Sequence, residues 1–144
     1  MANLFIEVGG LLPEFSQSVE KGLSTLSNGG RIIKQMTLNS TEKEILILKN
    51  FSGPIFELLV YNNSTIFKGL FYITSSIINI AKTSKAGDAN FTFIVKNNNF
   101  YLQVGSNTNF VLLGISNIYA ANEDKIALEE SYDDLSSPNV TVTV

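Results

Sequence analysis

Short runs of apolar residues, separated by small polar clusters, make up most of the chain after residue 30. The polar clusters are rich in Asn, Ser, Gly and Pro, which favour turns. Short apolar runs at a spacing of about ten residues, without alternating helical segments, are typical of antiparallel two-sheet folds. The sequence therefore predicts a mainly β protein, an antiparallel β-sandwich or jelly roll with a short N-terminal helix. The first five predicted strands cover residues 31–38, 44–49, 55–61, 65–73 and 76–81.

The segment from residue 91 to residue 115 predicts three further strands joined by two turns. Its first two runs alternate between apolar and polar positions, whereas residues 110–115 are apolar throughout. Residues 44–49 and 55–61 also carry apolar side chains on both faces. A sandwich that stands alone needs cover on only one face of each sheet, so these strands predict a second layer. That layer is either the N-terminal helix or a neighbouring copy, and we favour self-association with closed cyclic symmetry.

The N-terminal region has a different pattern of apolar and polar residues. Residues 3–8 predict a short strand, and residues 11–26 predict a helix with Pro13 in its first turn, where a missing N–H is tolerated. We expect residues 1–30 to form an N-terminal attachment segment and residues 31–144 to form a β-sandwich head domain. Two roles stay open for the helix, which are packing on its own domain and docking or trimerisation. Its apolar stripe, the candidate docking surface, consists of Leu12, Phe15, Val19, Leu23 and Leu26.

Composition narrows the classes of partner. Hydrophobic residues make up 44% of the 144 residues and charged residues only 16%, which is below the roughly 25% usual for soluble proteins. The net charge of −3 and a single arginine argue against nucleic acid, which requires clustered cations. The first residues lack the basic region of a secretory signal. The uncharged, mainly apolar stretch of residues 69–81 is shorter than the roughly 20 apolar residues of a membrane span.

The sequence offers little material for catalysis. It contains no histidine and no cysteine, so it lacks the usual general base, the usual nucleophile pairs and the common ligands of zinc. We therefore expect no catalytic residue, no cofactor and no metal site. A weaker hypothesis is a hydrolase with two carboxylates, because glycosidases need only two acids at a fixed separation. The acids among the predicted strands are Glu42, Glu44, Glu57 and Asp88.

The C-terminal region is acidic and then strand-like. Residues 123–134 concentrate carboxylates but lack the spacing of a calcium loop, so they predict a solvated segment or a short helix. Residues 139–144 alternate between valine and threonine apart from the first position. Such a strand needs an edge to pair with, either in its own sheet or in a neighbouring subunit.

Aromatic rings beside turn amides give a hint of sugar binding. A ring offers a stacking surface and short amides bind hydroxyl groups. The alternative interpretation is that the asparagines make turns and the tyrosines bridge core and surface. The candidate glycan-facing residues are Tyr61, Asn62, Asn63, Asn97, Asn98, Asn99 and Tyr101.

The combined pattern resembles the trimeric head domains of bacteriophage fibres and receptor-binding proteins, including capsid head fibres and tail-fibre tips. The resemblance lies in the helix of residues 12–26, the exit Gly29-Gly30, the short Asn/Ser/Thr-rich strands, and the stretch 85–104 as a late hairpin. It implies a non-enzymatic structural protein located in the virion. It also implies a homotrimer that contacts other virion proteins through its N-terminal segment and possible cell-surface glycans through its head. The alternative is a carbohydrate-binding module or lectin-like adhesin.

Overall fold

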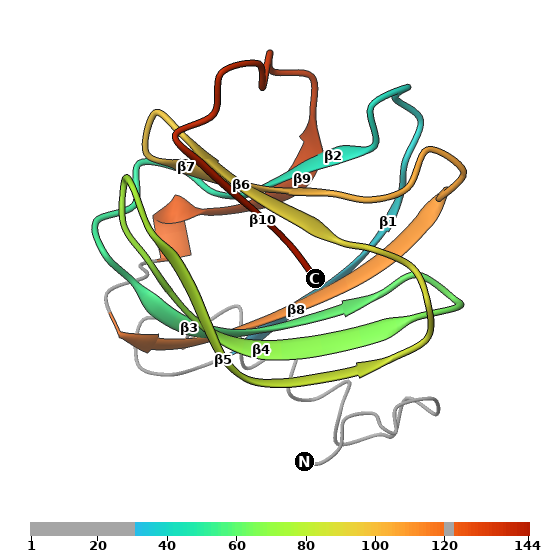
Figure 1. The fold of residues 1–144 in the computed structure, drawn as a ribbon, viewed down its shortest axis with the longest axis horizontal. Coiled ribbons are helices and arrows are strands. Elements are labelled where there is room, and N and C mark those ends of the chain that lie inside the picture. The colour runs from blue at the N-terminus through green and yellow to red at the C-terminus, as the bar shows by residue number, and fades with distance from the viewer. Residues whose placement is uncertain (1–30, 120–122) are drawn as a thin grey trace.

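The computed structural model describes residues 31–119 and 123–144 as two antiparallel sheets packed face to face (Figure 1). Each sheet has five strands, in the orders β1-β8-β3-β4-β5 and β10-β6-β7-β2-β9. The predicted antiparallel β-sandwich is therefore confirmed. The predicted N-terminal strand and helix lie outside the described residues. Within those residues, no helix has the length and apolar character that a membrane crossing requires.

The two sheets are named A and B by their strands. Sheet A contains β1 (Arg31–Thr37), β8 (Phe110–Tyr119), β3 (Ile55–Tyr61), β4 (Ile66–Ile73) and β5 (Ile78–Ala86). Sheet B contains β10 (Val140–Thr143), β6 (Thr92–Lys96), β7 (Asn99–Gln103), β2 (Glu44–Leu48) and β9 (Ile126–Ser131). The 3-10 turn η2 (Glu123–Lys125) leads into β9.

Alternation along the strands places the core between the sheets. In β3, Phe56, Leu58 and Val60 are fully buried while the residues between them are partly exposed, as expected for a strand with one face inward. At the centre, Phe71 of sheet A stacks on Phe56 at 5.4 Å between ring centroids. Its ring also meets Phe93 of sheet B edge-on at 4.9 Å. Phenylalanine packing therefore joins the two layers directly.

Two strand assignments differ from the sequence prediction. The acidic segment was expected to be solvated or helical, but Ile126–Ser131 pairs with β2 as an edge strand. Leu128 anchors it in the core at 2% exposure, while Glu129 points into solvent. Strand β5 also continues to Ala86, beyond its predicted end at residue 81. An edge strand tolerates the exposed Lys, Thr and Ser residues in this part of the chain.

The C-terminal strand pairs with its own sheet. Strand β10 lies antiparallel to β6, with Val142 opposite Phe93. The pairing is extended by two backbone hydrogen bonds between Phe91 and Val144, one in each direction. The edge that residues 139–144 were predicted to need is therefore supplied within the chain.

Candidate functional site

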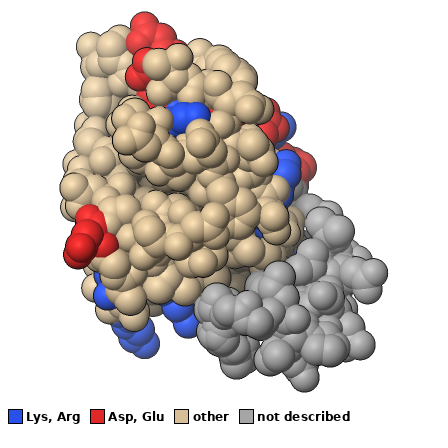
Figure 2. All heavy atoms as spheres, turned by 90° about the vertical axis from the view of Figure 1, so that its right-hand side faces the viewer, with Lys and Arg blue, Asp and Glu red and all other residues tan. Residues whose placement is uncertain are grey.

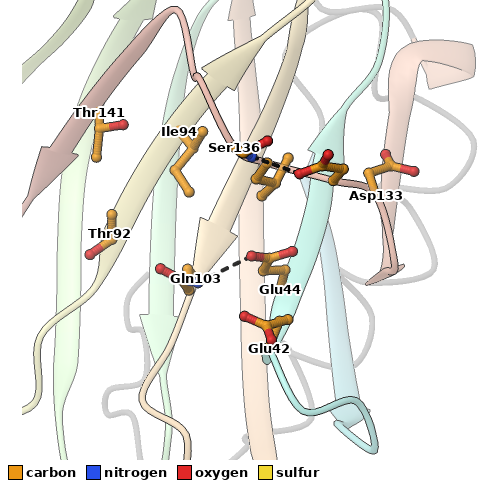
Figure 3. Close-up of a pocket in the computed structure, with 10 residues that line it drawn as sticks. Glu42, Glu44, Thr92, Ile94, Gln103, Asp133, Ser136 and Thr141 are labelled. Carbon is orange, nitrogen blue, oxygen red and sulfur yellow. Dashed lines mark hydrogen bonds between the residues drawn. The ribbon is translucent and has the colours of Figure 1, made fainter.

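The outer face of sheet B carries a hollow of about 440 Å³. Strands β2, β6, β7 and β10 form its floor, and residues 133–136 form its wall (Figure 3). A second hollow of about 320 Å³ shares Glu42, Glu44 and Asp133 with it. The lining of the larger hollow comprises Glu42, Glu44, Thr92, Ile94, Gln103, Asp133, Asp134, Leu135, Ser136 and Thr141.

Two side chains of sheet B hold the wall in place. The hydroxyl of Tyr101 donates a hydrogen bond to Asp133 Oδ2 at 2.7 Å. The Lys96 ammonium donates to the backbone carbonyl of Asp134 at 2.8 Å and also to that of Ser136. The segment therefore lies against the sheet, and Tyr101 is only 3% exposed although it is on the outer face.

Glu44 is a carboxylate in an unusual position. It is 4% exposed, and it points toward Gln103, whose Nε2 donates to Glu44 Oε2 at 3.1 Å (Figure 3). Burial raises the pKa of Glu44 above its ordinary value, and repulsion from Glu42 raises it further. The hydrogen bond from Gln103 acts in the opposite direction, and the charges of Asp133 and Asp134 add smaller increases.

The pKa values of two groups near Glu44, Tyr101 and Asp134, shift in opposite directions. Burial, followed by the hydrogen bond to Asp133, raises the pKa of Tyr101 to about 12, so the phenol stays a neutral donor. The pKa of Asp134 is lowered, because the Ser136 N–H donates to its Oδ1 at 2.9 Å and Lys96 lies nearby. The site thus combines a fixed donor, one stabilised carboxylate and one destabilised carboxylate.

The structure separates the acids considered for hydrolysis. Glu42 and Glu44 line the hollow on sheet B, whereas Glu57 lies on sheet A and pairs with Lys68 at 3.6 Å. Among residues 31–119 and 123–144, no group of three or more acids is arranged to hold a metal ion. The grouping of Glu44, Gln103 and Asp133 was not predicted from the sequence. The one local sign of it is that Glu44 and Gln103 are polar residues at the ends of apolar strands.

The first predicted glycan-facing turn is built by its own side chains. Asn62 Oδ1 accepts hydrogen bonds from the N–H groups of Ser64 and Thr65, at 3.1 and 2.8 Å, which is an Asx turn. Asn63 is exposed with a positive φ of 75°. The ring of Tyr61 is partly buried and packs edge-on against Phe110.

The second predicted glycan-facing turn lies at the opposite end of the sandwich (Figure 1). Asn97 and Asn98 occupy positive φ in the β6–β7 hairpin, and the side chain of Asn99 accepts from the Asn50 N–H at 3.0 Å. Tyr101 is buried, so its ring offers no open stacking face. The structure does not bring the two turns together, and glycan binding at either one stays a prediction.

The outer face of sheet A is apolar. Gly114 lies between Ile33 and Leu59 in the strand register, and a Cβ at Gly114 would lie 3.6 Å from each of these side chains. Tyr72 on the same face is 43% exposed, and the other members are partly or largely buried. We call this surface the apolar face of sheet A, and its residues are Ile33, Ile55, Leu59, Tyr61, Leu70, Tyr72, Phe110 and Leu112.

The predicted second layer differs between the two sheets. On sheet B, residues 133–136 of the same chain lie against the outer face and bond to Tyr101 and Lys96 of β7 and β6. On sheet A, the two-sided apolar character of β3 and β8 is present as the apolar face. The predicted docking residues Leu12, Phe15, Val19, Leu23 and Leu26 lie outside the described residues.

Comparison with known proteins gives limited results. No protein-family model matches the sequence, and no curated protein matches it. Among solved structures, a similar chain is the tailspike protein gp49 from Acinetobacter baumannii bacteriophage Fri1, a capsular polysaccharide depolymerase. The sequence identity is 12% and the TM-score is 0.39, and the match covers 70% of this chain but only 19% of the tailspike chain. A match at these values does not indicate a function for this chain.

Proposed function

We propose that this protein is a non-enzymatic structural protein of a bacteriophage virion that assembles as a homotrimer through the apolar face of sheet A. The β-sandwich forms the head of the assembly, and the N-terminal segment contacts other virion proteins. The observation that carries this proposal is the apolar face itself, a set of large side chains on the outer side of a sheet whose inner side already forms the core.

The shape and charge of this face support its convergence with the same face of two other copies around a three-fold axis. The side chains of Ile33 and Leu59 flank Gly114 so closely that an added Cβ would contact both, so the apolar face is continuous across β1, β8 and β3. The charged residues Glu57 and Lys68 on this face pair with each other, so burying them leaves no net charge unmatched. Contiguous exposed apolar surface on soluble proteins marks interaction sites.

The rest of the surface suits a passive, densely assembled protein. On the side shown in Figure 2, charged residues are few and separated by broad uncharged areas. The whole sequence contains no histidine and no cysteine, which are the residues that most often serve as general bases and nucleophiles at neutral pH. A structural role requires neither.

The mass of the protein in solution tests the assembly. We expect light scattering to give three times the chain mass of 15.8 kDa. Leu59→Glu places a charge at the centre of the apolar face and should yield single chains with an unchanged far-UV circular dichroism spectrum. If Leu59→Glu fails to fold, Tyr72→Glu serves instead, because its side chain is 43% exposed and carries little of the core.

A matched control is Ile77→Glu, which adds the same charge at a residue that is 48% exposed in the β4–β5 turn. We expect Ile77→Glu to remain trimeric. A wild-type protein that runs as a folded single chain would contradict the proposal, as would a trimer that survives both changes on the apolar face.

The virion role has a separate test. Genes for virion proteins are expected to lie together, so the genes on either side of this one should encode capsid or tail proteins. Antibodies against the chain should also label intact particles in electron micrographs. Unlabelled particles, in a preparation where a known capsid protein is labelled, would contradict the virion assignment without affecting the trimer.

A further inference from the structure

The hollow on sheet B has an excess of negative charge. Four carboxylates line it, from Glu42, Glu44, Asp133 and Asp134. In the part of the chain that the structure describes, the ion pair is Lys68 with Glu57 on the other sheet, so none of the four carboxylates is paired with a cation. The nearest ammonium, that of Lys96, is committed to backbone carbonyls of the wall.

The position of Glu44 indicates that this negative charge serves to bind a ligand. Its side chain is 4% exposed, and its Oε2 accepts one hydrogen bond, from the neutral amide of Gln103. Its Oε1 has no hydrogen-bond donor among the described residues. A buried carboxylate is costly unless it is paired and hydrogen-bonded, so this oxygen is an acceptor that the described residues leave available to a further donor.

The arrangement favours an organic cation over a metal ion. A divalent metal needs several convergent acidic ligands, and the described residues contain no such group. A guanidinium carries five N–H donors in a plane and can bind a carboxylate through two of them. Thr141 adds a hydroxyl group to the lining (Figure 3), whereas the hydroxyl group of Thr92 is hydrogen-bonded to Thr143 Oγ1 at 2.9 Å.

The hollow also offers apolar contact. Ile94 and Leu135 are part of its lining, and the methylene stem of Arg or Lys packs on such side chains while its charged head meets polar groups. The volume of about 440 Å³ is within the usual range of roughly 300–1,000 Å³ for binding pockets. One long cationic side chain therefore fits both the charge and the size of the hollow.

We propose that the hollow on the outer face of sheet B is a binding site for an Arg or Lys side chain presented by a partner protein. Glu44 is the main acceptor, with Glu42 and Asp133 at the rim. The site lies on the opposite face of the molecule from the apolar face of sheet A, so it does not depend on the trimer or on the virion assignment.

The test is a titration of the full-length, 15N-labelled protein with arginine amide, which carries the guanidinium without a competing carboxylate. We expect saturable shifts in the backbone amides of Thr92, Ile94 and Gln103, while amides on sheet A stay unchanged. Binding should weaken as sodium chloride is raised, because salt screens charge pairs at a partly open site.

Variants identify the acceptors. Glu44→Gln keeps the size of the side chain and removes its charge, and we expect it to weaken binding about tenfold or more. Glu42→Gln changes an exposed residue that makes no hydrogen bond among the described residues. It should weaken binding a few-fold and keeps the test valid if Glu44→Gln fails to fold. Glu57→Gln, on sheet A, is the matched control and should leave binding unchanged.

Three outcomes would overturn the proposal. The first is an absence of saturable shifts at the hollow. The second is binding of arginine amide that Glu42→Gln and Glu44→Gln both leave unchanged. The third is a stronger response of the same amides to calcium chloride or to maltose than to arginine amide, which would make the hollow a metal site or a neutral sugar site.

Discussion

At the scale of single residues, Glu44 and its surroundings show how one side chain can be suited to binding at the expense of stability. Its carboxylate lies on the outer face of a strand and lines the hollow, yet the residue is only 4% exposed. Burial and the adjacent Glu42 both favour its neutral form. The wall itself is held by Lys96 and Tyr101. Stability is therefore coupled to the protonation of this one group.

We predict that Glu44→Gln raises the melting temperature at pH 7. The folded-state pKa of Glu44 lies above its ordinary value of 4.5, so in a window above 4.5 the folded state holds more protons than the unfolded state. The contribution of Glu44 to stability is therefore fully present at low pH and is lost as the pH rises through its folded-state pKa.

The advantage of Glu44→Gln should accordingly shrink or vanish at pH 4, as measured by thermal unfolding at both pH values. Glu129→Gln is the control, because that carboxylate is exposed to solvent on the edge strand β9. A melting temperature for Glu44→Gln below that of wild type at pH 7 would mean that the hydrogen bond from Gln103 outweighs the burial of charge.

At the scale of elements, the β6–β7 hairpin shows how two asparagines set a register. Asn97 and Asn98 have φ values of 53° and 63°, and they join Lys96 to Asn99, which are opposite each other in the ladder. Positive φ at both central residues defines the turn that matches the twist of paired strands. The Asn98 carbonyl also accepts the Phe51 N–H at 3.0 Å, so the turn supports the loop after β2.

We predict that Asn98→Val destabilises the protein by roughly 1–2 kcal/mol, since a β-branched residue pays that penalty in the left-handed region. Asn98→Gly should stay within about 1 kcal/mol of wild type, because glycine adopts positive φ freely. Urea denaturation of the two variants compares them directly. Equal stability of the valine and glycine variants would show that the backbone conformation of this turn is not under strain.

Local patterns were sufficient for most strands and insufficient for the hollow. The short apolar run of residues 55–61 and the alternation in residues 91–105 predicted β3, β6 and β7 closely. Strand β9 was missed, since charge density on an edge strand resembles that of a solvated segment. The meeting of Glu44 with Asp133 depends on tertiary folding over 89 positions, and no local pattern records it.

At the scale of the whole molecule, a cluster of phenylalanines unites the sheets. Phe56, Phe67 and Phe71 from sheet A contact Phe93 and Phe100 from sheet B, and all five are at most 2% exposed. Phe93 and Phe100 stack at 5.7 Å. Because each ring touches members of both layers, neither sheet can lose its packing while the other keeps its own. The sandwich should therefore unfold as one unit.

We predict that Phe71→Ala costs about 3–5 kcal/mol of unfolding free energy, the range for a large ring removed from a packed core. Far-UV and near-UV circular dichroism should report the same denaturation midpoint. Ile77→Ala, at a residue that is 48% exposed, should cost no more than about 0.5 kcal/mol. Two separate transitions in the wild-type protein would show that the sheets unfold independently.

The order of strands in sheet B has a consequence for synthesis on the ribosome. Sheet A has all its strands once residue 119 has been made, whereas both edges of sheet B, β9 and β10, are translated later. Until then the nascent chain presents unpaired backbone on both sides of the β6-β7-β2 centre, with Glu44 still open to water. Formation of the acidic hollow is thus among the final events in the synthesis and folding of each molecule.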